Sequence, residues 1–89
     1  IYVDADKLQY PLMLRYKKEG DVFYPFGMNS EKKLSKFFTD EKYTQIEREE
    51  QVLLCSGEDI VWVVGKRLDD RFKIIKDTKR AVKISKLEN

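Results

Sequence analysis

The chain has 89 residues, of which 42% are hydrophobic and 38% are charged, and its net charge is +2. This composition favours one folded domain with a heavily charged surface over disorder, and we assign that domain to residues 1–89. The chain contains no histidine, so it lacks Ser-His and Cys-His nucleophile pairs and the commonest metal ligand. A single cysteine, Cys55, excludes an internal disulfide and a cysteine-based zinc site.

The sequence gives no sign of a membrane segment. Its longest uncharged apolar run, Ile60–Val64, is far shorter than the roughly 20 residues that a membrane span needs, and no signal peptide is visible. We therefore expect a cytoplasmic protein without a membrane partner. Because the chain begins at Ile1 and is short for an enzyme, we also expect it to be part of a longer protein.

The first third of the chain has the pattern of short strands. A strand is expected at Ile1–Val3, and another at Leu12–Tyr16, whose alternating leucines and tyrosine predict one buried face. A turn at Gly20, where a positive φ angle costs little, leads to a returning strand at Val22–Tyr24. Pro25 ends that strand because it has no amide hydrogen to donate.

A short basic helix is predicted over Glu31–Phe38, with Ser30 as its N-cap. Three apolar side chains at positions i, i+3 and i+4 share one face of this helix: Leu34, Phe37 and Phe38. Lys32 and Lys36 are predicted on the opposite face. A helix of this length is not stable alone, so its apolar face must pack against a sheet.

A second short helix is predicted from Thr44. Thr44-Gln45-Ile46-Glu47 matches the capping box, in which a threonine and a glutamate each accept a hydrogen bond from the other's backbone amide. The residues that follow are mostly acidic. We therefore expect two short helices of different charge.

The second half of the chain predicts the core of a sheet. Val52–Cys55 and Ile60–Val64 read as a hairpin around a turn, and the second strand is apolar enough to be covered on both faces. Cys55 and Trp62 are interpreted as core residues. Two last strands are expected at Phe72–Ile74 and Ala81–Ser85.

The residues offer no catalytic constellation. The four glycines fit neither a phosphate-binding loop nor a dinucleotide fingerprint. Asp69 and Asp70 are adjacent, so on an extended chain they point to opposite faces and make a poor acid–base pair. We expect them to be solvated or to pair with Arg67 and Arg71, and we expect no independent catalysis by this chain.

Charge is distributed unevenly along the sequence. Residues 1–36 carry 7 basic and 5 acidic groups, residues 37–65 carry 2 and 7, and residues 66–89 carry 9 and 4, which gives +2, −5 and +5. Such a pattern can produce one basic face that binds the phosphates of a nucleic acid. It is equally compatible with a surface whose charges serve solubility.

Two segments of the chain together resemble one family. Residues 4–42 contain a leucine strand ending in Arg15, then Gly20-Asp21, Pro25-x-Gly27-Met28 and Lys33-Leu34-Ser35-x-Phe37-Phe38; residues 47–72 contain Arg48, Ile60-Val61-Trp62-Val63-x-Gly65 and Asp69-Asp70-x-Phe72. In this order and spacing they resemble the C-terminal domain of tRNA(Ile)-lysidine synthetase, over roughly Asp4 to Lys73.

The resemblance implies an α+β fold: a small, strand-rich, layered β-sandwich-like domain with two short helices, similar to a domain of the phenylalanyl-tRNA synthetase β subunit. It also implies that the full protein is an ATP-dependent ligase that joins lysine to the wobble cytidine of an isoleucine tRNA. The catalytic domain that uses ATP and magnesium precedes this one in the family. No cofactor or metal site is therefore expected within residues 1–89.

The partners implied are tRNA(Ile), contacted at its acceptor stem, and the protein's own N-terminal catalytic domain, with a homodimer as a further possibility. Eight basic residues are predicted to bind RNA: Arg15, Lys17, Lys18, Lys32, Lys33, Lys36, Arg67 and Arg71. The alternative is a protein-interaction or dimerisation module without direct RNA contact. Gly27, Gly65 and the aromatic residues are interpreted as structural.

Overall fold

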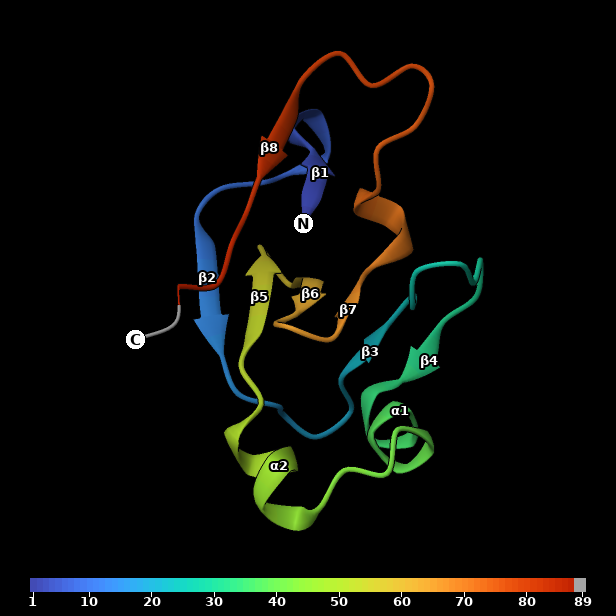
Figure 1. The fold of residues 1–89 in the computed structure, drawn as a ribbon, viewed down its shortest axis with the longest axis vertical. Coiled ribbons are helices and arrows are strands. Elements are labelled where there is room, and N and C mark those ends of the chain that lie inside the picture. The colour runs from blue at the N-terminus through green and yellow to red at the C-terminus, as the bar shows by residue number, and fades with distance from the viewer. Residues whose placement is uncertain (88–89) are drawn as a thin grey trace.

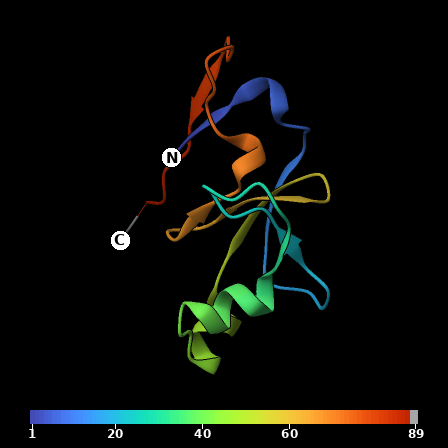
Figure 2. The ribbon, with the colours of Figure 1, turned by 90° about the vertical axis from the view of Figure 1, so that its right-hand side faces the viewer.

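The fold is strand-rich and has two short α-helices at one end. The computed structural model describes residues 1–87. A four-stranded sheet lies in the middle of the molecule, and two two-stranded ribbons and the helices pack around it (Figures 1 and 2). The α+β class predicted from the sequence is confirmed.

The central sheet is antiparallel, with the strand order β2-β5-β6-β7. Its strands are β2 (Leu12–Arg15), β5 (Leu53–Ser56), β6 (Asp59–Val63) and β7 (Arg67–Leu68). The predicted hairpin forms its centre, because β5 and β6 are the most apolar segments of the chain and pair with each other.

A bulge in this hairpin determines which residues face each side of the sheet. Leu54 pairs with Trp62 and Cys55 pairs with Ile60, so Val61 has no partner of its own in β5. Val61 and Trp62 consequently both pack on one side, while Ile60 and Val63 pack on the other. The Val61 carbonyl accepts a hydrogen bond of 2.8 Å from the Asp69 amide, which fixes the start of the next loop to the bulge.

One side of the sheet is covered by helix α1 (Leu34–Asp40). The predicted apolar face is confirmed, since Leu34, Phe37 and Phe38 are all buried against the sheet. Tyr43 stacks on Phe38 with 4.4 Å between ring centroids. Helix α2 (Gln45–Glu50) follows, and its predicted capping box is present.

The other side of the sheet is covered by the ribbon of β1 (Tyr2–Asp4) and β8 (Ala81–Lys83), which joins the two ends of the chain. Val3 packs here against Trp62, which is 7% exposed and is confirmed as a core residue. Two 3-10 turns, η1 (Ala5–Lys7) and η2 (Asp70–Phe72), flank this layer.

The first helix begins later than predicted. Lys32–Lys33 form strand β4, which pairs with β3 (Val22–Phe23), so Lys32 does not lie on the helix and Ser30 is not its cap. Lys33 occupies the N-cap position without a side-chain hydrogen bond. Pairing with β3, about ten residues earlier in the chain, overrides the local helix signal.

Two further predictions are wrong. The expected strand at 72–74 is instead the end of η2 followed by an irregular segment. The face of β2 that the alternating pattern predicted as buried is largely open, because Leu14 is 66% exposed and Tyr16, which follows the strand, is 61% exposed. β2 is an edge strand of the sheet, and among the described residues no further strand pairs with its outer side.

Candidate nucleic-acid interface

The basic residues predicted to bind RNA come from three segments, and the structure brings two of them together at the start of α1. The turn between β2 and β3 meets the helix where the Leu34 amide donates a hydrogen bond of 2.9 Å to the Asp21 carbonyl. Lys33 is paired with Val22, the residue after Asp21. Lys17, Lys18 and Lys33 therefore belong to one part of the surface.

Arg15 has a structural role inside this region. Its guanidinium forms two hydrogen bonds to the Asp21 carboxylate, of 2.8 and 2.9 Å, and a third of 3.0 Å to the Tyr16 carbonyl. Burial opposes ionisation of Asp21, but the hydrogen bonds from Arg15 and from the Lys18 amide outweigh it and hold the pKa of Asp21 below its ordinary value. Asp21 in turn raises the pKa of Arg15. Arg15 thus fixes the turn that carries Lys17 and Lys18.

Lys32 and Lys36 share one carboxylate at the end of α1. Their ammonium groups lie 2.6 and 3.1 Å from the Asp40 carboxylate oxygens, and both hold the pKa of Asp40 below its ordinary value. The Lys32 side chain is only 22% exposed, whereas that of Lys36 is 65% exposed. Because exposed ion pairs contribute little free energy, Lys36 can exchange Asp40 for a phosphate more easily than Lys32 can.

Arg67 extends this basic region to the other end of α1. Its guanidinium lies 5.5 Å from the centroid of the Phe37 ring and 3.9 Å from a Glu41 carboxylate oxygen. Lys17, Lys18 and Lys33 thus lie near the N-terminal end of the helix, whereas the Lys36 ammonium and Arg67 lie near its C-terminal end. We call this set the α1 surface: Lys17, Lys18, Lys33, Lys36 and Arg67.

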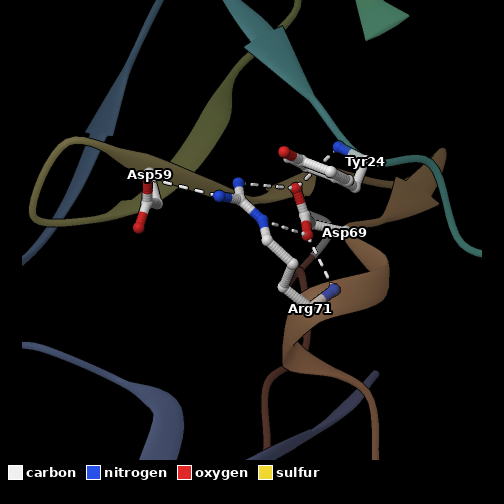
Figure 3. A network of polar contacts seen from close by, with 4 residues as sticks. All are labelled: Tyr24, Asp59, Asp69 and Arg71. Carbon is white, nitrogen blue, oxygen red and sulfur yellow. Dashed lines mark hydrogen bonds and ion pairs between the residues drawn. The ribbon is translucent and has the colours of Figure 1, made fainter. Parts of the chain in front are cut away.

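Arg71 lies outside the α1 surface and belongs to a network around Asp69 (Figure 3). The buried Asp69 carboxylate accepts hydrogen bonds from the Arg71 Nε and Nη2 atoms, both of 3.0 Å, from the Arg71 amide at 2.8 Å and from the Tyr24 amide at 2.9 Å. The guanidinium also stacks over the Tyr24 ring at 4.4 Å and reaches Asp59 at 3.5 Å. Of the alternatives expected from the sequence, pairing with Arg71 is observed for Asp69. Arg67 instead lies next to Glu41.

Asp70 fixes the Pro25–Met28 turn. Its carboxylate accepts hydrogen bonds from the Gly27 amide at 3.1 Å and from the Lys73 ammonium at 3.1 Å, and these two groups hold the pKa of Asp70 below its ordinary value. Gly27 has a φ angle of +90°, which only glycine adopts without strain. The two adjacent aspartates are structural: one binds the end of β3 and the other binds the turn that follows it.

Within residues 1–87, the cations of the α1 surface differ in how firmly they are held. Lys17, Lys18 and Lys33 have no acidic side chain within 4.0 Å among these residues, whereas Arg67 has Glu41 near that limit. Sequence reasoning identified the basic positions but not the carboxylates that engage some of them. Local spacing offered some signals, among them Asp69-Asp70 beside Arg71 and the i, i+4 spacing of Lys36 and Asp40.

Residues 1–87 contain no group of three or more histidine, cysteine, aspartate or glutamate side chains that could hold a metal ion. None of the helices in these residues is both long and apolar enough to cross a membrane.

Residues 12–85 match the family model described as the TilS substrate C-terminal domain. The chain belongs to this family. The resemblance seen in the sequence is therefore confirmed, and it extends through β8, beyond the segment that carried the motifs.

Curated relatives of the family cover nearly the whole chain. The chain is 58% identical over 81 residues to a tRNA(Ile)-lysidine synthase of Parabacteroides distasonis, 46% identical over 79 residues to that of Bacteroides thetaiotaomicron, and 42% identical over 83 residues to that of Clostridium acetobutylicum. The matches cover 91%, 89% and 93% of this chain but 18% of each relative. The chain thus spans less than a fifth of the length of these relatives.

Two solved structures share the fold. A crystal structure of a TilS C-terminal domain matches with a TM-score of 0.76 and 25% identity, over 90% of this chain and 62% of that one. An N-terminal fragment of the phenylalanyl-tRNA synthetase β subunit from Pyrococcus horikoshii matches with a TM-score of 0.72 and 18% identity, over 90% of this chain and 25% of that one. The second likeness shows the fold alone. It agrees with the similarity to a domain of the phenylalanyl-tRNA synthetase β subunit that the sequence resemblance implied.

Proposed function

We propose that this domain is the tRNA-binding part of a tRNA(Ile)-lysidine synthase and has no catalytic activity of its own. The observation that carries the proposal is the family match over residues 12–85, together with relatives that bear this enzyme's name. The expected contact is the acceptor stem. In this proposal the domain holds the tRNA while a separate catalytic domain acts on the anticodon.

The α1 surface supports the proposal by its charge. Lysines on a fixed turn, on β4 and on α1 present point charges that need no exact geometry to bind phosphates. The deep, narrow major groove of an RNA duplex does not admit side chains, so contacts to phosphates and 2′-hydroxyls are the expected mode. Arg15, Lys32 and Arg71 stay candidates, but each is engaged by a carboxylate of the domain.

The activity of the whole protein is part of the same proposal. We infer that it is an ATP-dependent ligase that attaches lysine to the wobble cytidine of tRNA(Ile), with ATP and magnesium bound by the N-terminal catalytic domain and the enzyme in the cytoplasm. Two domains that bind one tRNA raise the effective concentration of the RNA at the second site. This domain would thereby lower the tRNA concentration that the catalytic domain needs.

The test is direct binding of residues 1–89 to tRNA(Ile), to its acceptor-stem hairpin and to its anticodon hairpin across a salt series. We expect the tRNA and the acceptor-stem hairpin to bind, with a logarithm of affinity that falls linearly with the logarithm of the salt concentration. The variant Lys33→Glu/Lys36→Glu should bind more weakly and with a shallower salt slope, at unchanged folding. Failure of all three RNAs to bind near physiological salt would refute the proposal.

A second candidate function, a contact with protein, is favoured by an apolar groove of about 860 Å³ on the other side of the sheet. Leu14, Trp62, Ile84 and Leu87 line this groove, and β2 leaves one edge unpaired among the described residues. An open strand edge with apolar side chains can pair with another chain. Light scattering distinguishes the two: a dimer that Leu14→Glu converts to a monomer, without RNA binding by the dimer, would favour the protein contact.

A further inference from the structure

The segment between η2 and β8 contains a basic cluster that lies apart from the α1 surface. Residues 73–86 carry six basic side chains, namely Lys73, Lys76, Lys79, Arg80, Lys83 and Lys86, against one acidic side chain, Asp77. In both ribbon views the loop of residues 73–80 lies at the end of the molecule opposite α1 and α2 (Figures 1 and 2). The molecule measures 39 Å along its longest axis, so one patch does not cover both regions.

A buried carboxylate holds this loop in place. Asp4, which is 4% exposed, accepts a hydrogen bond of 3.0 Å from the Thr78 hydroxyl, and the same hydroxyl accepts one of 2.8 Å from the Ile75 amide. The Ala5 amide donates to the Arg80 carbonyl at 2.9 Å, which joins the loop to η1. The loop therefore presents its cations from a defined frame tied to β1.

Four cations occupy this frame. Lys76 and Lys79 flank the Thr78 anchor, and Arg80 bonds Asp6 at 2.7 Å, next to Lys7 in η1. Among residues 1–87, no acidic side chain lies within 4.0 Å of Lys7, Lys76 or Lys79. The side chains of Arg80 and Asp6 are 74% and 48% exposed, so their ion pair is weak and exchangeable. We call Lys7, Lys76, Lys79 and Arg80 the β8-loop surface.

We propose that the β8-loop surface is a second phosphate-binding surface, and that the domain contacts duplex RNA at two separate places. The proposal rests on the proposed function, because RNA as the ligand comes from there. Three of the four cations have no acidic partner within 4.0 Å among residues 1–87, and such an excess of positive charge on a fixed frame is the feature that attracts a nucleic-acid backbone. A rigid duplex can reach both ends of a small domain, as when double-stranded RNA-binding domains contact successive grooves over about 16 base pairs.

Two-point contact has a measurable consequence. Each phosphate contact steepens the dependence of log affinity on log salt by about 0.9, so loss of two contacts makes the slope shallower by about 1.8. When the salt concentration is raised from 50 to 200 mM, the affinity of such a variant should fall by a factor that is about ten times smaller than the factor for the unmodified domain. Loss of contacts at both surfaces should add, because the two surfaces share no side chain.

The experiment measures tRNA(Ile) binding across salt for four double variants of residues 1–89. Lys76→Glu/Lys79→Glu tests the β8-loop surface, and Lys33→Glu/Lys36→Glu tests the α1 surface. Lys42→Glu/Lys66→Glu is the matched control, since it changes the net charge equally but reverses two lysines that lie outside both surfaces and outside residues 73–86. Lys76→Gln/Lys79→Gln repeats the test without introducing repulsion. Urea unfolding establishes that every variant is folded.

We expect both Lys76/Lys79 variants to bind at least about tenfold more weakly at low salt than the control, with a shallower slope. If they behave like the control while the α1 variant loses affinity, the second surface is refuted and the proposed function stands. If the unmodified domain binds no RNA, both fail. If the loop instead serves a protein contact, Ile74→Ser/Ile75→Ser, which removes two exposed apolar side chains, should abolish self-association. The Lys76/Lys79 variants should then keep full RNA affinity. This result would also overturn the proposal.

Discussion

Substitution of Asp69 by asparagine should destabilise the domain strongly, although it changes one atom. The carboxylate is fully buried and accepts four hydrogen bonds of 2.8 to 3.0 Å, two on each oxygen. An asparagine side chain keeps one oxygen, so two bonds survive. Its NH2 group, however, replaces the other oxygen and is itself a hydrogen-bond donor. Depending on the orientation of the amide, it faces either one donor of Tyr24 and one of Arg71 or two donors of Arg71, and none of these groups can accept a hydrogen bond.

The size of the effect follows from these bonds. A hydrogen bond to a charged group contributes about 1.5–3 kcal/mol. The Arg71 side chain is 37% exposed, so water can replace part of a hydrogen bond that its guanidinium loses, and the cost of losing that bond is smaller. One backbone bond lost in full and one guanidinium bond lost in part give about 2–3 kcal/mol. Since a domain of this size is stable by roughly 5–13 kcal/mol, this is a large fraction of its stability.

Urea unfolding followed by Trp62 fluorescence measures the loss. With a slope of about 1 kcal/mol per molar urea, the midpoint should fall by about 2–3 M. Asp77→Asn is the matched control, because Asp77 is exposed and the same change there should stay within about 0.5 kcal/mol. A loss below about 1 kcal/mol for Asp69→Asn, or one equal to that of the control, would contradict the assigned role of the network.

Four other predictions concern stability and reactivity. The pKa of Asp70 is lowered in the fold, so the ionised carboxylate stabilises the domain fully above its ordinary pKa of about 3.9. This stabilisation is lost as the pH falls through the lowered pKa. The difference in urea midpoint between the unmodified domain and Asp70→Asn should therefore shrink below about pH 4. Phe38→Ala should cost about 3–5 kcal/mol by the same assay, since Phe38 is fully buried. Thr44→Ala removes the cap of α2 and should cost about 1 kcal/mol. Burial raises the pKa of the Cys55 thiol and shields it from solvent, so Cys55 should react with a thiol reagent only as fast as the domain unfolds. Rapid reaction in the folded state would contradict the burial of Cys55.

The sequence predicted best the features that neighbouring residues determine. The capping box at Thr44 and the apolar hairpin of β5 and β6 are local signals, and both are present. The start of α1 was misplaced because Lys32 and Lys33 pair with β3, about ten residues earlier in the chain. The irregular segment after Phe72 was read as a strand because its alternation resembles one, whereas its backbone follows the turn that Asp69 and Asp70 fix.

The candidate interface shows a similar division. Sequence reveals where charge is concentrated, such as the excess of +5 in residues 66–89, but none of the four residues of the β8-loop surface was among the predicted RNA-binding residues, and Lys7 joins that surface from the other end of the chain. Sequence also does not reveal which carboxylate each cation meets, because those partners come from other elements. Asp21 engages Arg15 across a turn, and Asp6 engages Arg80 from the opposite end of the chain.

Arginine and lysine consequently have different roles in this domain. Within residues 1–87 every arginine contacts a partner of the domain itself: Arg15, Arg48, Arg67, Arg71 and Arg80. The planar guanidinium suits such fixed, multiple hydrogen bonds. Most lysines have no such partner, and their flexible ammonium groups suit phosphates, whose position along a backbone varies. We therefore expect substitution of the lysines of the α1 surface and the β8-loop surface to change RNA affinity at constant stability, and substitution of Arg15 or Arg71 to lower stability first.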